Sequence, residues 1–279
     1  MTYFCEYSFF MSDFFKNKVV AITGGTNGIG KALVDALIQS GASVATCSRN
    51  QDTLYDLQVA YSDKTLHTLV CDVSRYEDCK NFIKTTIDTF GGIDILINNA
   101  GISMRALLED ADIDVIRKVM DTNFYGTAYC SKLAVDTIIK RKGTIVGVSS
   151  IAGYRGLPGR TGYSASKYAV NGFLEALRTE LMGYGVNVMW VCPGFTSSNI
   201  RNAALNNKGI VQKENPMDEN KMMPAEECAQ HILNAIEKRK RTLVLTFTGK
   251  KTVFMNKFFP AWTDKLVRNF YYKGNDLVK

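Results

Sequence analysis

Tyr163 and Lys167 form the most chemically suggestive pair in this chain of 279 residues, in the segment Tyr163-Ser-Ala-Ser-Lys167. Side chains four residues apart lie on the same face of a helix. A free tyrosine titrates at about pH 10 and is a poor base at neutrality. Because the charge of a nearby lysine favours the phenolate, it lowers the tyrosine pKa. The pair is therefore suited to general acid/base chemistry, with Tyr163 as the group that moves the proton.

Two further polar side chains precede this pair. Ser150 ends the apolar run Thr144-Ile-Val-Gly-Val-Ser-Ser150, and Asn123 lies in Asp121-Thr-Asn-Phe-Tyr-Gly126. Ser150 could hold a substrate oxygen through a neutral hydrogen bond, and the amide of Asn123 could hold a water that leads to Lys167. Taken singly, a tyrosine is more often a core residue and a lysine a solvated cation. All four in this order, each beside the end of an expected strand, favour catalysis.

The elements that must position these residues alternate along the chain. Apolar runs predict strands at residues 18–23, 43–48, 66–71, 93–98, 144–149, 186–192 and 242–247. Helices are expected at residues 28–40, 51–61, 75–90, 113–141, 162–184 and 225–239. Strands that are apolar throughout and alternate with helices indicate a parallel sheet covered on both faces. The sequence thus predicts an α/β fold: a single Rossmann-type, doubly wound parallel sheet of about seven strands, with a C-terminal helical extension.

A glycine-rich turn, Thr23-Gly-Gly-Thr-Asn-Gly-Ile-Gly30, follows the first expected strand and opens a helix. Glycine allows the backbone to turn tightly and to approach a phosphate, and a helix N-terminus offers free N–H groups and a positive dipole end. An ordinary strand-to-helix turn is the alternative, but the strand and helix context favours a dinucleotide site. The expected cofactor contacts of this turn are Gly24, Thr26, Asn27, Gly28, Ile29 and Gly30.

The second expected strand ends in Cys47-Ser48-Arg49-Asn50. A site for NAD usually has an acid there, which binds the ribose 2′-hydroxyl. Here Ser48 occupies that position and Arg49 follows, and a guanidinium group suits a 2′-phosphate through two parallel hydrogen bonds. A surface arginine at a helix start is the alternative. The pattern favours NADP(H) over NAD(H).

The ends of the third and fourth strands offer further contacts. Asp72, followed by Val73, could accept a hydrogen bond from the adenine amino group, or it could cap the following helix. The small residues Asn99-Ala100-Gly101 would let the backbone lie against the adenine ribose, or form only a tight turn. We include Asp72, Val73, Asn99, Ala100 and Gly101 in the expected cofactor site.

Together these segments resemble the short-chain dehydrogenase/reductase family, classical type. The matching segments, in the family's order and spacing, are Thr23–Gly30, Asn98–Gly101, Asn123, Ser149-Ser150, Tyr163–Lys167 and Pro193-Gly194. The resemblance implies that Tyr163 is the general acid/base, with Lys167 as its activator and ribose ligand. It also implies that Ser150 orients the substrate and that Asn123 serves the proton relay. The nicotinamide-side contacts that it implies are Pro193, Gly194 and Thr196.

The resemblance implies a homodimer or homotetramer. This sequence departs from the family's pattern in two respects. Asn27 stands where many NADP-dependent members have a basic residue, so phosphate recognition depends on Arg49, helped by Ser48. The chain also continues past the usual end of the fold, at the seventh strand. We divide it into an N-terminal extension at residues 1–17, a catalytic domain at 18–248 and a basic aromatic tail at 249–279.

Composition excludes several other classes of protein. Residues 238–279 hold 11 Lys/Arg against 2 Asp/Glu, whereas residues 1–237 hold 23 against 25. A body near neutrality argues against nucleic-acid binding.

Seven scattered cysteines without a Cys-x-x-Cys pair indicate reduced thiols in the cytoplasm, with no disulfide framework and no metal site. The first 18 residues lack the basic start of a signal peptide, so we expect residues 1–10 to be poorly ordered and Met11 to be a candidate start.

The tail reads as two short helices broken at Pro260. Aromatic and aliphatic residues recur at helical spacing, and lysines and arginines fall among them. One interpretation is contact with an anionic membrane surface, and the other is an aromatic face that covers the substrate cleft or a neighbouring subunit. The residues at this spacing are Phe254, Phe258, Trp262, Leu266 and Phe270.

The sequence therefore predicts an NADPH-dependent oxidoreductase that interconverts a ketone and a secondary alcohol on a lipophilic or acyl-type substrate, with a place in lipid metabolism. One alternative is a hydroxysteroid-type dehydrogenase that works oxidatively, and another is a non-catalytic NADPH-binding regulator. Substrate choice is expected to lie in residues 105–110, 152–159 and 195–223, the last a long irregular segment typical of a lid. We expect a cytoplasmic protein with possible peripheral contact to a membrane.

Overall fold

The computed structural model describes residues 13–62, 64–213, 222–274 and 276–277. Seven parallel strands form one sheet in the order β3-β2-β1-β4-β5-β6-β7. Their bounds are β1 Val19–Thr23, β2 Ser43–Ser48, β3 Leu66–Val70, β4 Ile95–Asn98, β5 Thr144–Val148, β6 Asn187–Cys192 and β7 Thr242–Val244. Because the order reverses beside β1, the sheet is doubly wound, as the sequence predicts.

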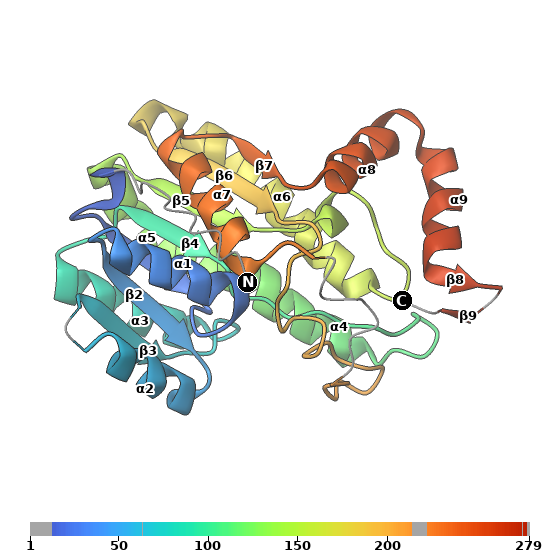
Figure 1. The fold of residues 1–279 in the computed structure, drawn as a ribbon, viewed down its shortest axis with the longest axis horizontal. Coiled ribbons are helices and arrows are strands. Elements are labelled where there is room, and N and C mark those ends of the chain that lie inside the picture. Colours follow the sequence, from blue (N-terminus) through green and yellow to red (C-terminus); the bar gives the residue numbers. More distant parts are fainter. Residues whose placement is uncertain (1–12, 63, 214–221, 275, 278–279) are drawn as a thin grey trace, which may run out of the picture.

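Helices cover both faces of this sheet (Figure 1). One face carries α1 Gly28–Gln39, α2 Gln51–Ala60 and α7 Ala225–Glu237, and the other carries α3 Tyr76–Phe90, α5 Gly126–Arg141 and α6 Thr161–Leu181. Along β1, Val20 and Ile22 pack toward the first group of helices, and Ala21 packs toward the second. This alternation, with every residue of β1 buried, explains why that strand is apolar up to its last residue, Thr23.

The long helix expected at residues 113–141 has three parts. The segment begins as α4 Ile113–Met120, continues through a π-helical turn, η2 Asp121–Tyr125, and resumes as α5. Single π turns inside α-helices often occur at functional sites. Here the turn contains Asn123.

The seventh strand ends earlier than the sequence suggests. β7 stops at Val244, and α8 Phe247–Phe258 begins before the expected boundary at residue 249. Thr246 causes this change: its backbone has φ of 62°, and its hydroxyl accepts a hydrogen bond from the N–H of Gly249 at 3.1 Å. Such a cap fixes the first turn of a helix. The division of the chain into three parts stays a prediction.

Two helices and a short hairpin complete the fold. α9 Pro260–Tyr271 follows α8, with Pro260 at its first position, where the missing N–H costs nothing. The strands β8 Tyr272–Lys273 and β9 Asp276–Leu277 pair antiparallel. In Figure 1, α8 and α9 form an arm beyond the edge of the sheet.

Arg155 attaches this arm to the body. The residue follows the short helix η3 Ile151–Gly153, and its guanidinium donates to Asn256 Oδ1 at 3.0 Å and to Asp264 Oδ1 at 2.5 Å. The amide of Asn256 in turn donates to the carbonyl oxygen of Tyr154 at 2.8 Å. One arginine thus bridges both helices of the arm to the loop that carries Ser150.

The N-terminal segment contributes to the core where it is described. Phe15, in the short helix η1 Asp13–Phe15, is buried against α1 and the sheet. The predictions about residues 1–10 and Met11 lie outside the described residues. Six cysteines, at positions 47, 71, 79, 130, 192 and 228, are buried free thiols. In the described part of the chain, no helix is both long and apolar enough to span a bilayer.

Candidate active site

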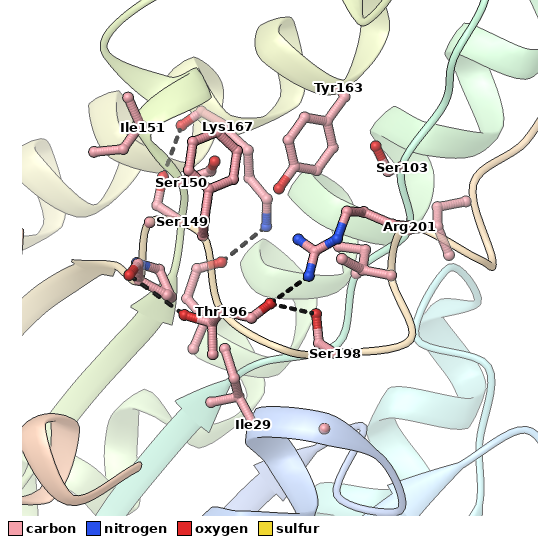
Figure 2. Close-up of a pocket in the computed structure, with 18 of the residues that line it drawn as sticks. Ile29, Ser103, Ser149, Ser150, Ile151, Tyr163, Lys167, Thr196, Ser198 and Arg201 are labelled. Carbon is pink, nitrogen blue, oxygen red and sulfur yellow. Dashed lines mark hydrogen bonds between the residues drawn. The ribbon is translucent and has the colours of Figure 1, made fainter. Parts of the chain in front are cut away.

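A cavity of about 660 Å³ lies at the carboxyl ends of the strands. The glycine turn and the ends of β2, β3 and β4 form one end of it. Tyr163, the segment after β6 and the inner sides of α8 and α9 form the other. The structure brings to this one cavity every expected cofactor and catalytic residue except Asn123, which lies buried behind its wall. Figure 2 is a close-up of this pocket, in which Tyr163 and other residues that line it are drawn.

The glycine turn is held by hydrogen bonds to the end of β4. The amide of Asn99 donates to the carbonyl oxygens of Thr23 and Gly24, at 3.0 Å each. The hydroxyl of Thr23 accepts from the N–H of Ala100 at 3.0 Å. Gly30 has no space for a side chain, because a Cβ there would lie 2.2 Å from the oxygen of Gly24. This close approach brings the start of α1 to the cavity wall, as a pyrophosphate site requires.

The end of β2 carries the residues expected to select the nucleotide. Ser48 Oγ accepts a hydrogen bond from Thr26 Oγ1 at 3.2 Å, which connects the end of β2 to the glycine turn. Arg49 lines the cavity and is exposed, and no ion pair is formed by it within the described residues. The donor set therefore fits a phosphate on the adenine ribose.

Asp72 uses one carboxylate oxygen locally. Its Oδ1 accepts from the N–H and the hydroxyl of Ser74, at 3.0 and 2.8 Å. The helix α3 begins later and has Arg75 as its N-cap, so the alternative interpretation of Asp72 as the helix cap is wrong. The carboxylate lines the cavity, and binding to an adenine amino group stays a prediction.

Tyr163 and Lys167 lie one turn apart near the start of α6, with exposed fractions of 8% and 4%. Lys167 Nζ is 5.7 Å from the centroid of the Tyr163 ring and donates to the carbonyl oxygen of Val148 at 2.8 Å. Ser150 follows β5 as the N-cap of η3, where its hydroxyl accepts from the N–H of Ala152 at 3.1 Å. All three side chains face the same space (Figure 2).

Burial dominates the titration of this pair. It raises the pKa of Tyr163, and a hydrogen bond with Ser150 and the positive charges of Arg160 and Arg201 act in the opposite direction. Burial also lowers the pKa of Lys167 to about 8. The sequence predicts that Lys167 lowers the tyrosine pKa. In the structure the pKa of Tyr163 is raised by burial, and the groups that oppose this rise are Ser150 and the two arginines, whereas a contribution of Lys167 stays a prediction.

Asn123 joins three elements behind Ser150, Tyr163 and Lys167. Its Oδ1 accepts from the N–H of Ile102 at 2.8 Å, and its Nδ2 donates to the carbonyl oxygen of Ile102 and to Ser166 Oγ, each at 2.9 Å. Both N–H groups of the amide are thus used, and only its oxygen has room for another donor. A Cβ at Gly101 would lie 3.1 Å from this oxygen and 3.5 Å from Lys167 Nζ. A relay water on Asn123 stays a prediction.

Two arginines of the cavity were missed by the sequence analysis. Arg201 is 8% exposed and donates to the carbonyl oxygen of Thr196 at 2.6 Å, close to the hydroxyl of Tyr163 in Figure 2. Arg160 precedes α6 and also lines the cavity. Arg201 belongs to the irregular segment after β6, where no periodicity indicates which side chains point inward.

The tail supplies part of the apolar wall. Of the five residues at helical spacing, Leu266 and Phe270 line the cavity, whereas Phe254, Phe258 and Trp262 do not. Tyr271 is 4% exposed and lies at the inner end of α9, and Phe270 stacks on Phe195 with ring centroids 6.5 Å apart. Thr246 and Thr248, just before the tail, line the cavity, and so do the tail residues Gly249, Lys251, Thr252, Met255, Thr263, Leu266, Val267, Phe270 and Tyr271.

A doubly wound sheet with a glycine turn at one end of the cleft and a tyrosine–lysine pair at the other defines a dinucleotide-dependent oxidoreductase. The family described as short chain dehydrogenase matches residues 18–209. The chain belongs to the short-chain dehydrogenase/reductase family and acts on CH–OH groups.

Named relatives agree with this assignment. The chain is 34% identical over 256 residues to Dehydrogenase/reductase SDR family member 7B of Xenopus laevis, covering 87% of this chain and 78% of that protein. It is 32% identical over 275 residues to 11-beta-hydroxysteroid dehydrogenase A of Arachis hypogaea, covering 93% and 78%. A short-chain dehydrogenase of Burkholderia cenocepacia, solved in complex with NADP, has a TM-score of 0.76 at 23% identity, covering 91% of this chain and 98% of that one. The structural likeness confirms the fold.

Proposed function

We propose that this protein is an NADPH-dependent reductase that interconverts a ketone and a secondary alcohol, with Tyr163 as the general acid/base. The observation that carries the proposal is the placement of the Tyr163 and Ser150 side chains in the same cavity as the glycine turn. Tyr163 gives its proton to the substrate oxygen, and Ser150 holds that oxygen. Lys167 supplies the nearby charge that favours the phenolate in the reverse direction.

The cofactor that fits the other end of the cavity is NADP(H), which supplies or accepts the hydride when bound. The start of α1 and the residues from Gly24 to Gly30 would hold its pyrophosphate. Ser48 and Arg49 would hold the 2′-phosphate, and Asp72 the adenine. Pro193, Gly194 and Thr196 would lie along the nicotinamide. The preference for NADP over NAD is supported by Arg49, and by the NADP bound in the Burkholderia relative.

A lipophilic or acyl-type substrate suits the apolar end of the cavity. Leu157, Ile200, Met255, Leu266 and Phe270 line it. Oxidation of a hydroxysteroid is a second candidate, favoured by the name of the Arachis relative. A regulator that only binds NADPH is disfavoured, because Asn123, Ser150, Tyr163 and Lys167 are all present.

Assembly and location belong to the same proposal. We expect a homodimer or homotetramer, because the long helices at residues 113–141 and 161–181 could pair across a subunit interface. We also expect a cytoplasmic protein with a place in lipid metabolism.

The test is the consumption of NADPH and of NADH with steroid, 3-ketoacyl and small aromatic ketones, for the wild type and for Tyr163→Phe. Turnover by the wild type that collapses in the variant, while both bind NADPH, supports the reductase and identifies its substrate class. Tight NADPH binding without turnover in either direction on any ketone or alcohol would favour the regulator.

A further inference from the structure

Exposed aromatic side chains gather on α8 and α9. The exposed fractions are 81% for Phe247, 56% for Phe254, 55% for Phe258, 52% for Phe259 and 57% for Trp262. We refer to these five residues as the aromatic face. Phe254 and Phe258 stack with ring centroids 4.8 Å apart, so apolar surface continues from one ring to the next. A concentration of this kind on packed helices marks an interaction surface.

The aromatic face is distinct from the side of the arm that lines the cavity. On α9, Thr263 and Tyr271 are 3% and 4% exposed and line the cavity, whereas Trp262 is exposed and does not. On α8, Met255 lines the cavity and its neighbour Phe254 does not. The two interpretations of the tail are therefore compatible, since one side closes the cleft and the other faces outward.

Positive charge accompanies the aromatic face: Lys257 Nζ lies 5.6 Å from the centroid of the Phe258 ring. Further cations lie on the same two helices, and Lys251 among them lines the cavity. The exposed cations of these helices are Lys250, Lys251, Lys257, Lys265 and Arg268. Asp264 is the acidic residue of the two helices, and it is paired with Arg155. Aromatic side chains beside lysines and arginines match the interface of a bilayer, where rings enter the headgroup layer and cations meet anionic lipids.

We propose that the aromatic face docks this protein on the surface of an anionic lipid bilayer. A second copy of the chain is a poorer occupant, because pairing two of these faces would oppose like charges. Leu266 and Phe270 are 44% and 41% exposed while lining the cavity, so docking would bring the mouth of the cleft to the bilayer. That last step rests on the proposed function: a lipophilic ketone would enter directly from the membrane.

Vesicle co-sedimentation of the full chain tests the docking without any need for turnover. One set of vesicles is phosphatidylcholine, and the other is equal parts of phosphatidylcholine and phosphatidylserine. We expect binding to the anionic vesicles that weakens in high salt. Serine at Phe258 and Trp262 should reduce partitioning by about ten-fold for each side chain. Glutamate at Lys257 and Lys265 should reduce it by at least about ten-fold in total.

Matched controls lie elsewhere on the surface. Tyr55 and Val59, which are 64% and 58% exposed on α2, provide the same apolar-to-serine change away from the arm. Lys238 and Lys240 precede β7 at the amino end of the sheet, opposite the cleft, and provide the same charge reversal. The control variants should bind as the wild type does, and unfolding temperatures of all variants report whether each one folds.

Trp262 is also a built-in probe, because the other tryptophan of the chain, Trp190, is 6% exposed in β6. Lipids with a spin label near the headgroup should quench the fluorescence of the wild type. Trp262→Phe, which keeps an aromatic ring, should still bind, and the fluorescence of its remaining Trp190 should stay unquenched.

Four results would overturn the docking: no binding to anionic vesicles, equal binding to both vesicle types, equal losses in the control variants, or quenching of Trp190. Conversion of an oligomer to a monomer by the Phe258 and Trp262 substitutions, without vesicle binding by the wild type, would assign the face to a second copy. Because none of these measurements uses a ketone, they can refute the docking proposal without refuting the proposed reductase activity. A failure of the reductase activity would likewise leave the docking proposal intact.

Discussion

The two ends of the cleft are built differently. At the cofactor end, Thr23, Asn99 and Asn123 make hydrogen bonds to the main chain of neighbouring segments. At the substrate end, the arm presents half-exposed side chains and is bridged to the Ser150 loop by Arg155. The difference suggests where each property lies: we expect the fixed end to hold the cofactor and the arm to select which substrate enters.

Removal of the Tyr163 hydroxyl should have the largest effect on activity. We expect Tyr163→Phe to lower kcat by about a thousand-fold, because a positioned acid/base group contributes about two to four orders of magnitude. Tyr168→Phe is the matched control, since that exposed hydroxyl donates only to the carbonyl oxygen of Tyr154. Steady-state kinetics with NADPH titration checks both variants. Equal losses in the two would refute the catalytic role of Tyr163.

Burial of Lys167 should make the free energy of unfolding of the cofactor-free protein depend on pH. With its pKa lowered to about 8 from 10.5, folded Lys167 releases its proton before the unfolded chain does. Burial of the charge therefore destabilises the protein fully below pH 8, by about 3 kcal/mol. That cost disappears as the pH rises from about 8 to about 10.5, because the unfolded state then binds more protons.

Relative to Lys167→Met, the wild type should thus gain stability over that pH window. Urea unfolding of both proteins at about pH 7 and about pH 10 measures the difference. Lys132→Met, at an exposed position of α5, supplies the control and should show no such change. A constant difference between the wild type and Lys167→Met at the two pH values would mean that Lys167 is solvated.

A substitution of Arg49 tests whether this exposed residue of the fixed end binds the phosphate of NADPH. Loss of a charge-assisted hydrogen bond to a phosphate costs about 1.5–3 kcal/mol. We therefore expect Arg49→Ala to raise KM for NADPH by about ten- to a hundred-fold and to leave KM for NADH nearly unchanged. Arg75→Ala is the control, because Arg75 is paired with Asp78 and lies outside the cavity lining. An equal rise for both nucleotides would assign Arg49 to the protein surface.

Sequence patterns predict the fixed end well because its residues follow local rules. The buried strand Val19–Thr23 is apolar up to its last residue, and the glycine turn that lines the cleft follows directly after it. Gly30 is required by the contact of a single turn with the helix that follows it. These constraints act within a few residues of each other, so spacing alone reveals them.

The substrate end is less predictable because its contacts are between distant segments. Arg201 reaches Tyr163 through the path of the chain after β6, and no spacing indicates that path. The π turn around Asn123 depends on hydrogen bonds between backbone groups, which many sequences can make. Spacing did predict an apolar stripe on the tail, but only the fold separates Tyr271, which faces the cavity, from Trp262, which faces outward.

Arg155 should show the smallest and most selective effect. Ion pairs with an exposed partner contribute about 1 kcal/mol or less, and the carboxylate of Asp264 is 65% exposed. Arg155→Met should therefore change the free energy of unfolding by less than about 1 kcal/mol. It should raise KM for the ketone by a few-fold with kcat preserved, because the arm would be held less firmly while Ser150, Tyr163 and Lys167 stay unchanged.

Arg117→Met breaks a comparable pair with Asp114 on α4 and should leave both constants unchanged. Ketone kinetics at saturating NADPH, with limited proteolysis between α8 and α9, checks the two variants. A fall in kcat at constant KM for Arg155→Met would show that the arm affects the chemical step, because the position of the loop after Ser150 would then depend on the arm. The two ends of the cleft would then not act independently, because Arg155 links the arm to this loop.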